Sequence, residues 1–333
     1  EATNGADTFS IDTMNIGVSY TSASVSTVTK ASGGRPAESI ESIKFNAPRN
    51  YQTQNRAVID NDYQRIILAE NSDLQSVIAF GGEQASPPVY GKVYIAVKPF
   101  AERFATNTRK IQIKEGIADR VPLAIDPVII DADYTYVVPT ITTYYDLTST
   151  TSTSSAIEQS IRDAVSTFST NNLERFGNRL RFSRFVRALD NTSNGYILNN
   201  DVSLKLEKRF VPDFGKLQTI SLNYNNAIRK STLDSTQFTY KGFESYLDDD
   251  GLGNVNVYRF NDAKAKVNIT NNVGTINYET GAVLITGIAP TAVADLELKV
   301  SVIPERLDVI PIREQILLME SGDAVISVVG ENS

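Results

Sequence analysis

Residues 50–67 read NYQTQNRAVIDNDYQRII and place charged and aromatic side chains before a short amphipathic segment. Asp60 or Asn61 can accept hydrogen bonds from the first free amides of a helix, and Asp62 would lie near the positive end of its dipole. One apolar stripe follows at helical spacing and consists of Tyr63, Ile66 and Ile67. The stretch therefore predicts a helix that begins at a polar cluster, with Arg56 just before it.

The size and composition of the chain are those of a globular protein. It has 333 residues, 41% of them apolar and 21% charged, and this length suggests about two or three domains. No run of about 18 apolar residues occurs, which argues against a membrane-spanning helix. The chain starts at Glu1 without a signal-peptide pattern, so we expect a processed protein or a fragment of a longer one.

Three residue types are missing, and each absence excludes a class of chemistry. The chain contains no Cys, no His and no Trp, which removes Ser-His-Asp and Cys-His nucleophilic sites, zinc sites built from His or Cys, and disulfides. Catalysis would have to rest on carboxylates, Lys, Tyr or a hard cation, and we expect no cofactor. The net charge of −7 weighs against nucleic acid as a general partner.

The hydrophobic periodicity predicts a multidomain α+β fold, with small α/β units and mixed sheets followed by an all-β, sandwich-like domain. Val93, Ile95 and Val97 alternate as on a strand with one packed face, whereas the second half of the chain keeps a period near two between Gly, Asn and Asp turns. The expected parts are a β-rich arm or edge segment (1–45), an α+β domain (46–150), a two-helix plus strand unit (151–214) and the β-sandwich-like domain (215–333).

Two acidic groups are the best candidates for chemistry. Asp131 and Asp133 would project from the same face of a strand and could form a catalytic carboxylate pair, although strand-end aspartates explain them more simply. Asp248–Asp250 precede a flexible glycine and could close on calcium, but they lack the ligand spacing of a calcium loop. We interpret them as an acidic hairpin loop and leave cation binding open.

An arginine-rich stretch lies at 175–187, RFGNRLRFSRFVR. Its cations interleave with Phe, as on some nucleic-acid surfaces, but the chain as a whole is acidic. A partner-facing helix side is the better interpretation, because the planar guanidinium pairs well across protein interfaces. The interface candidates in this stretch are Arg181, Arg184 and Arg187.

Residues 33–67 resemble the signature of the baseplate-J-like family of contractile-tail phages and related injection machines. In that signature a Glu-Ser segment leads to Ala-Pro and then to an Arg-Ala-Val/Thr-x-x-Asp-Tyr helix start. Within the family, the likeness is to the C-terminal part of the baseplate wedge proteins of T-even-type phages. The matching residues are Glu38, Ser39, Ala47, Pro48, Arg56, Ala57, Val58, Asp62 and Tyr63.

One departure from the family pattern concerns the segment after GKVYIAVKP (91–99). Many members carry a clear helix there. In this chain, residues 102–123 are weakly periodic and are broken by Gly and Pro, which leaves the architecture around 100–122 open.

The resemblance implies a non-enzymatic structural subunit of a phage tail baseplate in the virion, assembled in the host cytoplasm. Its copies would contact one another in a ring around the tail hub, bind other wedge and hub proteins, and pass a shape change to the contracting sheath before genome ejection. No catalytic residues carry over, and neither nucleic acid nor membrane is an expected partner. The opening cluster then becomes a structural joint or interface made of Arg56, Asp60, Asp62 and Tyr63.

Two rival functions follow from other features. The 15 tyrosines and the β-rich last third could belong to a carbohydrate-binding or receptor-binding tail module, because Tyr stacks on sugars. A glycoside hydrolase that uses Asp131 and Asp133 is the third possibility.

Overall fold

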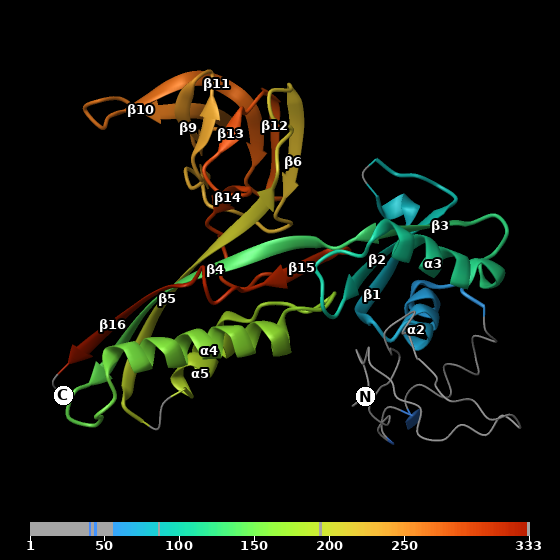
Figure 1. Ribbon diagram of the computed structural model, residues 1–333, viewed down its shortest axis with the longest axis horizontal. Coiled ribbons are helices and arrows are strands. Elements are labelled where there is room, and N and C mark those ends of the chain that lie inside the picture. Colours follow the sequence, from blue (N-terminus) through green and yellow to red (C-terminus); the bar gives the residue numbers. More distant parts are fainter. Residues whose placement is uncertain (1–39, 41–42, 45–55, 86, 193–194, 332–333) are drawn as a thin grey trace, which may run out of the picture. The chain divides into compact units, whose positions relative to one another are not determined.

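The computed structural model divides the chain into two compact units, an N-terminal unit (Glu1–Ala132) and a C-terminal unit (Asp133–Ser333). The finer division predicted at residues 45, 150 and 214 stays a prediction. The predicted edge segment of residues 1–45 lies almost wholly outside the described residues. The structure describes residues 40, 43–44, 56–85, 87–192 and 195–331 (Figure 1).

From residue 56 onward, the described part of the N-terminal unit is a three-stranded sheet with two α-helices. The strand order is β1-β2-β3, with β1 antiparallel and β3 parallel to β2. Val93, Ile95 and Val97 of β2 are buried with side chains from both helices, as their alternation predicts. The elements are α2 (Asp60–Glu70), β1 (Leu74–Gly81), η1 (Gly82–Gln84), β2 (Lys92–Pro99), α3 (Asn107–Ile117), η2 (Ala118–Arg120) and β3 (Asp126–Asp131).

The start of α2 differs in detail from the prediction. Ile59 is the N-cap residue, so neither Asp60 nor Asn61 caps the helix. Asp62 does so from inside the first turn, because its Oδ2 accepts the amides of Val58 at 3.2 Å and Ile59 at 3.1 Å. A carboxylate at the third helical position can reach back over the start of the helix, and this satisfies amides that the helix itself leaves unpaired.

The segment that weak periodicity left open contains a helix, α3. Only Ile113 and Ile117 of this helix are buried, which explains why its apolar pattern is faint. Charges hold the rest of it in place, and such contacts leave no period-3.6 signal in the sequence. The ion pairs to β3 join Lys110 to Asp131 at 2.5 Å and Lys114 to Asp126 at 2.8 Å.

The C-terminal unit is mostly β with some helix, and its helices lie in one stretch of the chain. Its elements are β4 (Asp133–Asp146), α4 (Ser154–Asn172), α5 (Phe182–Asp190), β5 (Ile197–Phe210), β6 (Gln218–Asn223), β7 (Asp234–Ser235), β8 (Phe238–Tyr240), β9 (Phe243–Asp249), β10 (Asn254–Phe260), β11 (Lys266–Asn277), β12 (Ala282–Ile288), β13 (Ala292–Val293), β14 (Leu298–Val302), β15 (Gln315–Leu318) and β16 (Val325–Glu331).

Strand β4 organises this unit because it is paired along both edges. Its antiparallel partner is β5, and both strands are 14 residues long. Along the other edge, β15 and then β16 pair with β4 in parallel, although they come at the end of the chain. Helices α4 and α5 cover one face of this ribbon (Figure 1), where Phe168 and Phe185 join a core with Ile141 and Leu204.

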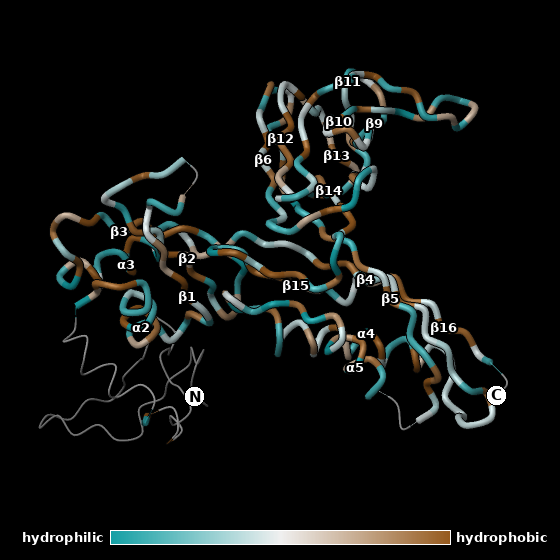
Figure 2. Tube along the Cα trace, turned by 180° about the vertical axis from the view of Figure 1, so that it is seen from behind, coloured by the Kyte–Doolittle hydropathy of each residue, from teal (hydrophilic) through white to brown (hydrophobic). Residues whose placement is uncertain are grey.

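The strands between β5 and β15 form a β-rich lobe, residues 218–302. Most of its strands follow one path, β14-β7-β9-β10-β11-β12-β6, and β14 joins this path to β5. Strands β8 and β13 lie off the path, where β8 pairs with both β9 and β13. Hydrophobic and hydrophilic residues alternate along the lobe in Figure 2, as in β6, where Ile220 and Leu222 are buried between exposed neighbours. This segment contains strands and no helix, as the all-β prediction requires, and its sandwich-like arrangement stays a prediction.

Replacing Asp62 tests the corrected helix start. Asp62→Ala removes the acceptor of two amides and should cost about 1 kcal/mol of stability, in the range for lost helix caps. Asp62→Asn keeps a side-chain oxygen and should cost less. Amide hydrogen exchange across α2 measures the local effect.

Asp60→Ala and Asn61→Ala are the matched controls, because both side chains are exposed and neither caps the helix. A loss of protection in α2 for either control that equals the loss for Asp62→Ala would contradict this assignment.

Candidate functional site

The cluster at the start of α2 separates into a buried half and an exposed half. Asp62 and Tyr63 are only 7% and 2% exposed, so they belong to the interior of the N-terminal unit. Arg56 and Asp60 are exposed. Between the two halves, the amide of buried Ala57 donates to the carbonyl of Arg120 at 2.9 Å and ties this segment to η2. The sequence prediction therefore groups residues with two different surroundings.

The electrostatics of the cluster are negative. Partial burial raises the pKa of Asp60, and the charge of Glu83 raises it further. Burial likewise raises the pKa of Tyr63, with Asp60 and Asp62 adding to the effect. The negative charges of Asp60, Asp62 and Glu83 thus disfavour one another around the start of α2.

The arginine-rich stretch lies at the end of α4 and on α5. All its arginines are exposed, and none has an ion pair with a carboxylate among the described residues. The apolar side of α5 instead packs inward through Phe185 and Leu189. The predicted division of α5 into an apolar and an arginine side is present. The set comprises Arg175, Arg179, Arg181, Arg184 and Arg187.

The two aspartates of the possible carboxylate pair have separate partners. Asp131 ends β3 in the N-terminal unit and pairs with Lys110 at 2.5 Å. Asp133 begins β4 in the C-terminal unit and pairs with Lys208, whose Nζ lies 2.7 and 2.6 Å from its two oxygens. Each aspartate is thus paired with a lysine of its own unit.

The acidic residues 248–250 lie only partly in the predicted hairpin loop, because Asp248 and Asp249 end strand β9 and only Asp250 belongs to the turn that leads to β10. Asp249 turns inward and accepts the amides of Ser231 at 2.7 Å and Leu233 at 2.8 Å. Asp250 accepts the amide of Leu252 at 2.8 Å, and Asp248 pairs with Lys266. The three carboxylates thus have separate partners. The described residues contain no group of three or more Asp, Glu, His or Cys side chains arranged to hold a metal.

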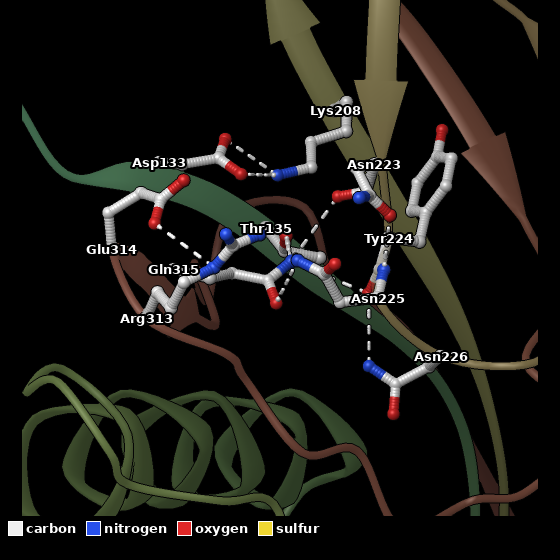
Figure 3. A network of polar contacts seen from close by, with 10 residues as sticks. All are labelled: Asp133, Thr135, Lys208, Asn223, Tyr224, Asn225, Asn226, Arg313, Glu314 and Gln315. Carbon is white, nitrogen blue, oxygen red and sulfur yellow. Dashed lines mark hydrogen bonds and ion pairs between the residues drawn. The ribbon is translucent and has the colours of Figure 1, made fainter. Parts of the chain in front are cut away.

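A buried polar network at the base of the lobe is missed by the sequence prediction. Lys208 is only 4% exposed, and burial lowers the pKa of this lysine, while Asp133 and then Glu314 oppose the effect. Figure 3 shows Asp133 and Lys208 facing each other beside Gln315. Gln315 Nε2 donates to Thr135 Oγ1 and to the carbonyl of Tyr224, the latter at 3.4 Å. The network therefore joins β4, β5, β15 and the end of β6.

A second cluster centres on Arg209, the neighbour of Lys208 on β5. Its side chain is 6% exposed and lies 3.7 Å over the ring of Tyr136 on β4. Burial alone would lower the pKa of Arg209, but the hydrogen bond to Asp323 and the nearby carboxylates raise it. The guanidinium contacts three carboxylates, Glu207 at 2.6 Å, Glu320 at 2.8 Å and Asp323 at 2.5 Å.

This cluster holds the returning end of the chain. Glu320 and Asp323 belong to the segment between β15 and β16, whereas Arg209 and Glu207 belong to β5.

The sequence contains a partial signal for the buried polar network around Lys208. Leu204, Leu206 and Lys208 alternate on the buried side of β5, which places a lysine where an apolar residue is expected. Such a residue predicts a buried partner, but not which one.

The tyrosines of the described residues are mostly covered by other side chains. Many of them are buried, and among the large exposed hydrophobic side chains of the described residues Tyr90 is the one tyrosine. Tyr246 and Tyr258 stack on each other with centroids 5.6 Å apart.

The described part of the chain has no helix both long and apolar enough to span a membrane. The tyrosines, in contrast, contribute to the core. The buried tyrosines are Tyr63, Tyr134, Tyr136, Tyr145, Tyr224, Tyr240 and Tyr258.

Two segments match models of baseplate protein domains. Residues 59–130 match "Baseplate structural protein gp6, C-terminal domain I". Residues 133–209 match "Baseplate structural protein gp6, C-terminal domain III". The gap between the matches falls at the boundary between the two compact units.

The chain is also similar in sequence to a curated protein whose name, like those of the two domain models, refers to gp6. The chain is 22% identical over 220 residues to "Baseplate wedge protein gp6" of Enterobacteria phage T4. The alignment covers 66% of this chain and 33% of the relative, so the chain spans about a third of the relative's length. Together with the domain matches, it supports a gp6-like baseplate protein. Membership of the wider baseplate-J-like family stays a prediction.

Among solved structures, the chain is similar to one in the cryo-EM structure of the anti-feeding prophage (AFP) baseplate, 6-fold symmetrised. The identity is 13%, and the match covers 55% of this chain and 42% of that chain with a TM-score of 0.38. We infer neither fold nor function from this level of similarity.

Removing Arg209 should destabilise the C-terminal unit. Arg209→Met leaves three carboxylates without their shared cation and should cost about 3 kcal/mol, as for a broken buried ion pair. Arg209→Lys keeps the charge but cannot reach all three carboxylates as a planar fork, so its loss should be intermediate. Urea unfolding followed by circular dichroism measures both.

Arg187→Met is the control, because Arg187 is exposed and has no ion pair with any described residue, and its effect should stay within about 0.5 kcal/mol. An Arg209→Met variant as stable as this control would show that the cluster contributes nothing.

The same cluster predicts a stability that depends on pH. Burial would raise the pKa of Asp323, but the hydrogen bond from Arg209 and other partners lower it below the ordinary 3.8. The stability that this shift provides is present above the unfolded pKa and is lost as the pH falls through the folded pKa. Urea midpoints between about pH 5 and pH 2 should therefore fall more steeply for the wild type than for Arg209→Met. Parallel curves would contradict the prediction.

Proposed function

We propose that the chain is part of a structural, non-enzymatic subunit of a contractile-tail baseplate. Copies of the subunit form a ring around the tail hub, bind neighbouring wedge proteins, and pass a change of shape to the sheath. The virion tail baseplate is then its location, reached by assembly in the host cytoplasm. The observation that carries the proposal is the pair of gp6 domain matches, which meet where the two compact units meet.

The ribbon of β4 and β5 suits a load-bearing role. A strand of 14 residues extends over about 45 Å at the usual rise per residue. Because β4 is paired on both edges and covered by helices on one face, bending it would break hydrogen bonds and disturb packing together. A ribbon of this kind moves as a rigid body when one end is displaced, and so transmits the displacement to the other end.

The interface candidates that are exposed indicate where the two units can contact neighbouring subunits. Arg56 and Asp60 are exposed in the N-terminal unit, and Arg181, Arg184 and Arg187 are exposed in the C-terminal unit. Each can meet a neighbouring subunit, whereas Asp62 and Tyr63 act inside their own unit. Closed symmetry would repeat each contact around a ring, so modest interfaces can sum to a stable assembly.

The carboxylates of the described residues support a structural role over hydrolysis. Asp131 and Asp133 neutralise separate lysines, and the acidic hairpin uses its carboxylates for internal hydrogen bonds. The glycan-binding alternative has no specific observation in its favour, since many tyrosines are core residues.

Assembly is the direct test of the proposal. Sedimentation velocity of the full-length protein, alone and co-expressed with the other proteins of its tail, should show self-association and co-sedimentation. Immunoelectron microscopy of purified tails should place the label at the baseplate. A protein that stays monomeric in every mixture, or label confined to another part of the virion, would reject the function.

A further inference from the structure

We propose that a hollow between the end of α4 and the start of α5 is a binding site for a carboxylate-rich segment of another polypeptide. The hollow has a volume of about 360 Å³. Three arginines line it, Arg179, Arg181 and Arg184, together with the amide side chains of Asn171, Asn172 and Asn178. The proposal deepens the proposed function, because it gives the chemistry of a partner for one of its candidate surfaces.

The walls of the hollow provide hydrogen-bond donors and positive charge without an internal counter-charge. None of the described residues that line it is Asp or Glu. Asp308 reaches the start of α5, but it accepts the amide of Phe182 at 2.8 Å and so acts as a cap for the helix. Glu174, in the connection from α4, accepts the hydroxyls of Ser169 at 3.1 Å and Thr170 at 3.3 Å. The described carboxylates near this surface are therefore used by other groups.

The arginines are held by ordered elements. Arg181 is the N-cap residue of α5, and Arg184 lies in its first turn. The strand bridge between Leu180 and Val309 fixes the chain just before this helix, with Leu180 fully buried. Phe168 of α4 and Phe185 of α5 meet with ring centroids 5.1 Å apart beneath the surface. A site with a fixed backbone loses less conformational entropy when a ligand binds.

The choice of arginine favours carboxylates as the ligand. All the cations between residues 175 and 187 are Arg and none is Lys. A guanidinium offers two parallel donors that match a carboxylate, whereas an ammonium offers a point charge. Five charges placed close together on a chain of net charge −7 repel one another, and an acidic partner would relieve that repulsion.

A polypeptide fits the site better than a nucleic acid does. Single-stranded nucleic acid is held by a basic groove combined with exposed aromatic rings for stacking. Here Phe168 lines the hollow but is only 6% exposed, Phe185 is fully buried and Phe182 packs against the core, so these rings offer little surface for stacking. The acidic net charge of the chain also opposes a long polyanion beyond the hollow itself.

Peptide binding tests the site. A fluorescently labelled hexaglutamate peptide should bind the full chain in an anisotropy titration. Its affinity should fall with added salt and should be higher than the affinity of a hexaglutamine peptide of the same length. The double variant Arg181→Gln/Arg184→Gln should reduce the affinity at least about tenfold, because charged hydrogen bonds are lost. Arg184→Lys keeps the positive charge but lacks the planar guanidinium, so its affinity for hexaglutamate should lie between those of the wild type and the double variant.

The matched control is Lys205→Gln/Arg229→Gln, which removes two exposed cations elsewhere in the same unit and should leave binding unchanged. Circular dichroism of each variant confirms that it is folded. Equal affinity of hexaglutamate for the wild type and the Arg181→Gln/Arg184→Gln variant would overturn the proposal. Tighter binding of a hexathymidylate oligonucleotide than of hexaglutamate would overturn it in favour of nucleic acid.

The result is separable from the test of the baseplate function. A chain that assembles into tails but does not bind hexaglutamate rejects the site and keeps the function. A chain that binds hexaglutamate through these arginines but never enters a tail keeps the site and rejects the function.

Discussion

The C-terminal unit depends on the double pairing of strand β4. One edge of this strand carries β5, and the other carries β15 and β16, which arrive more than 160 residues later in the chain. The ribbon is complete only when the last strands have returned, so folding must bring distant segments together before the sheet is stable. Helices α4 and α5, the buried Lys208 and the Arg209 cluster all lie on or beside this ribbon.

Local sequence patterns predicted much of the fold, while contacts between distant residues escaped them. The stripe of Tyr63, Ile66 and Ile67 and the alternation in β2 are apolar signals, and both elements are present. Helix α3 was left open because lysines paired with β3 carry little periodic signal. The capping role of Asp62 was assigned to its neighbours, since several polar residues lie within reach of one helix start.

The candidate site residues divide in the same way. The arginine side of α5 follows from spacing alone, because helical periodicity separates it from Phe185 and Leu189. The sequence did not identify Arg209 as a buried structural residue, because its carboxylate partners lie up to 114 residues away along the chain. A single sequence does not reveal such pairs. Two populations of arginine result. Arg209 is saturated with internal carboxylates and is structural, whereas those near α5 have none among the described residues.

The topology around β4 also bears on how such a protein diverges. Tyr136 has Glu207 of β5 on one side and Leu318 of β15 on the other, so the chain leaves for the lobe and comes back only about 10 Å apart, two strand spacings. The domain III match stops at Arg209, where this excursion begins. A module held by two neighbouring ends can be exchanged, enlarged or lost at small entropic cost to its host. The two neighbouring ends therefore make the lobe the part of the C-terminal unit whose size the rest of the fold constrains least.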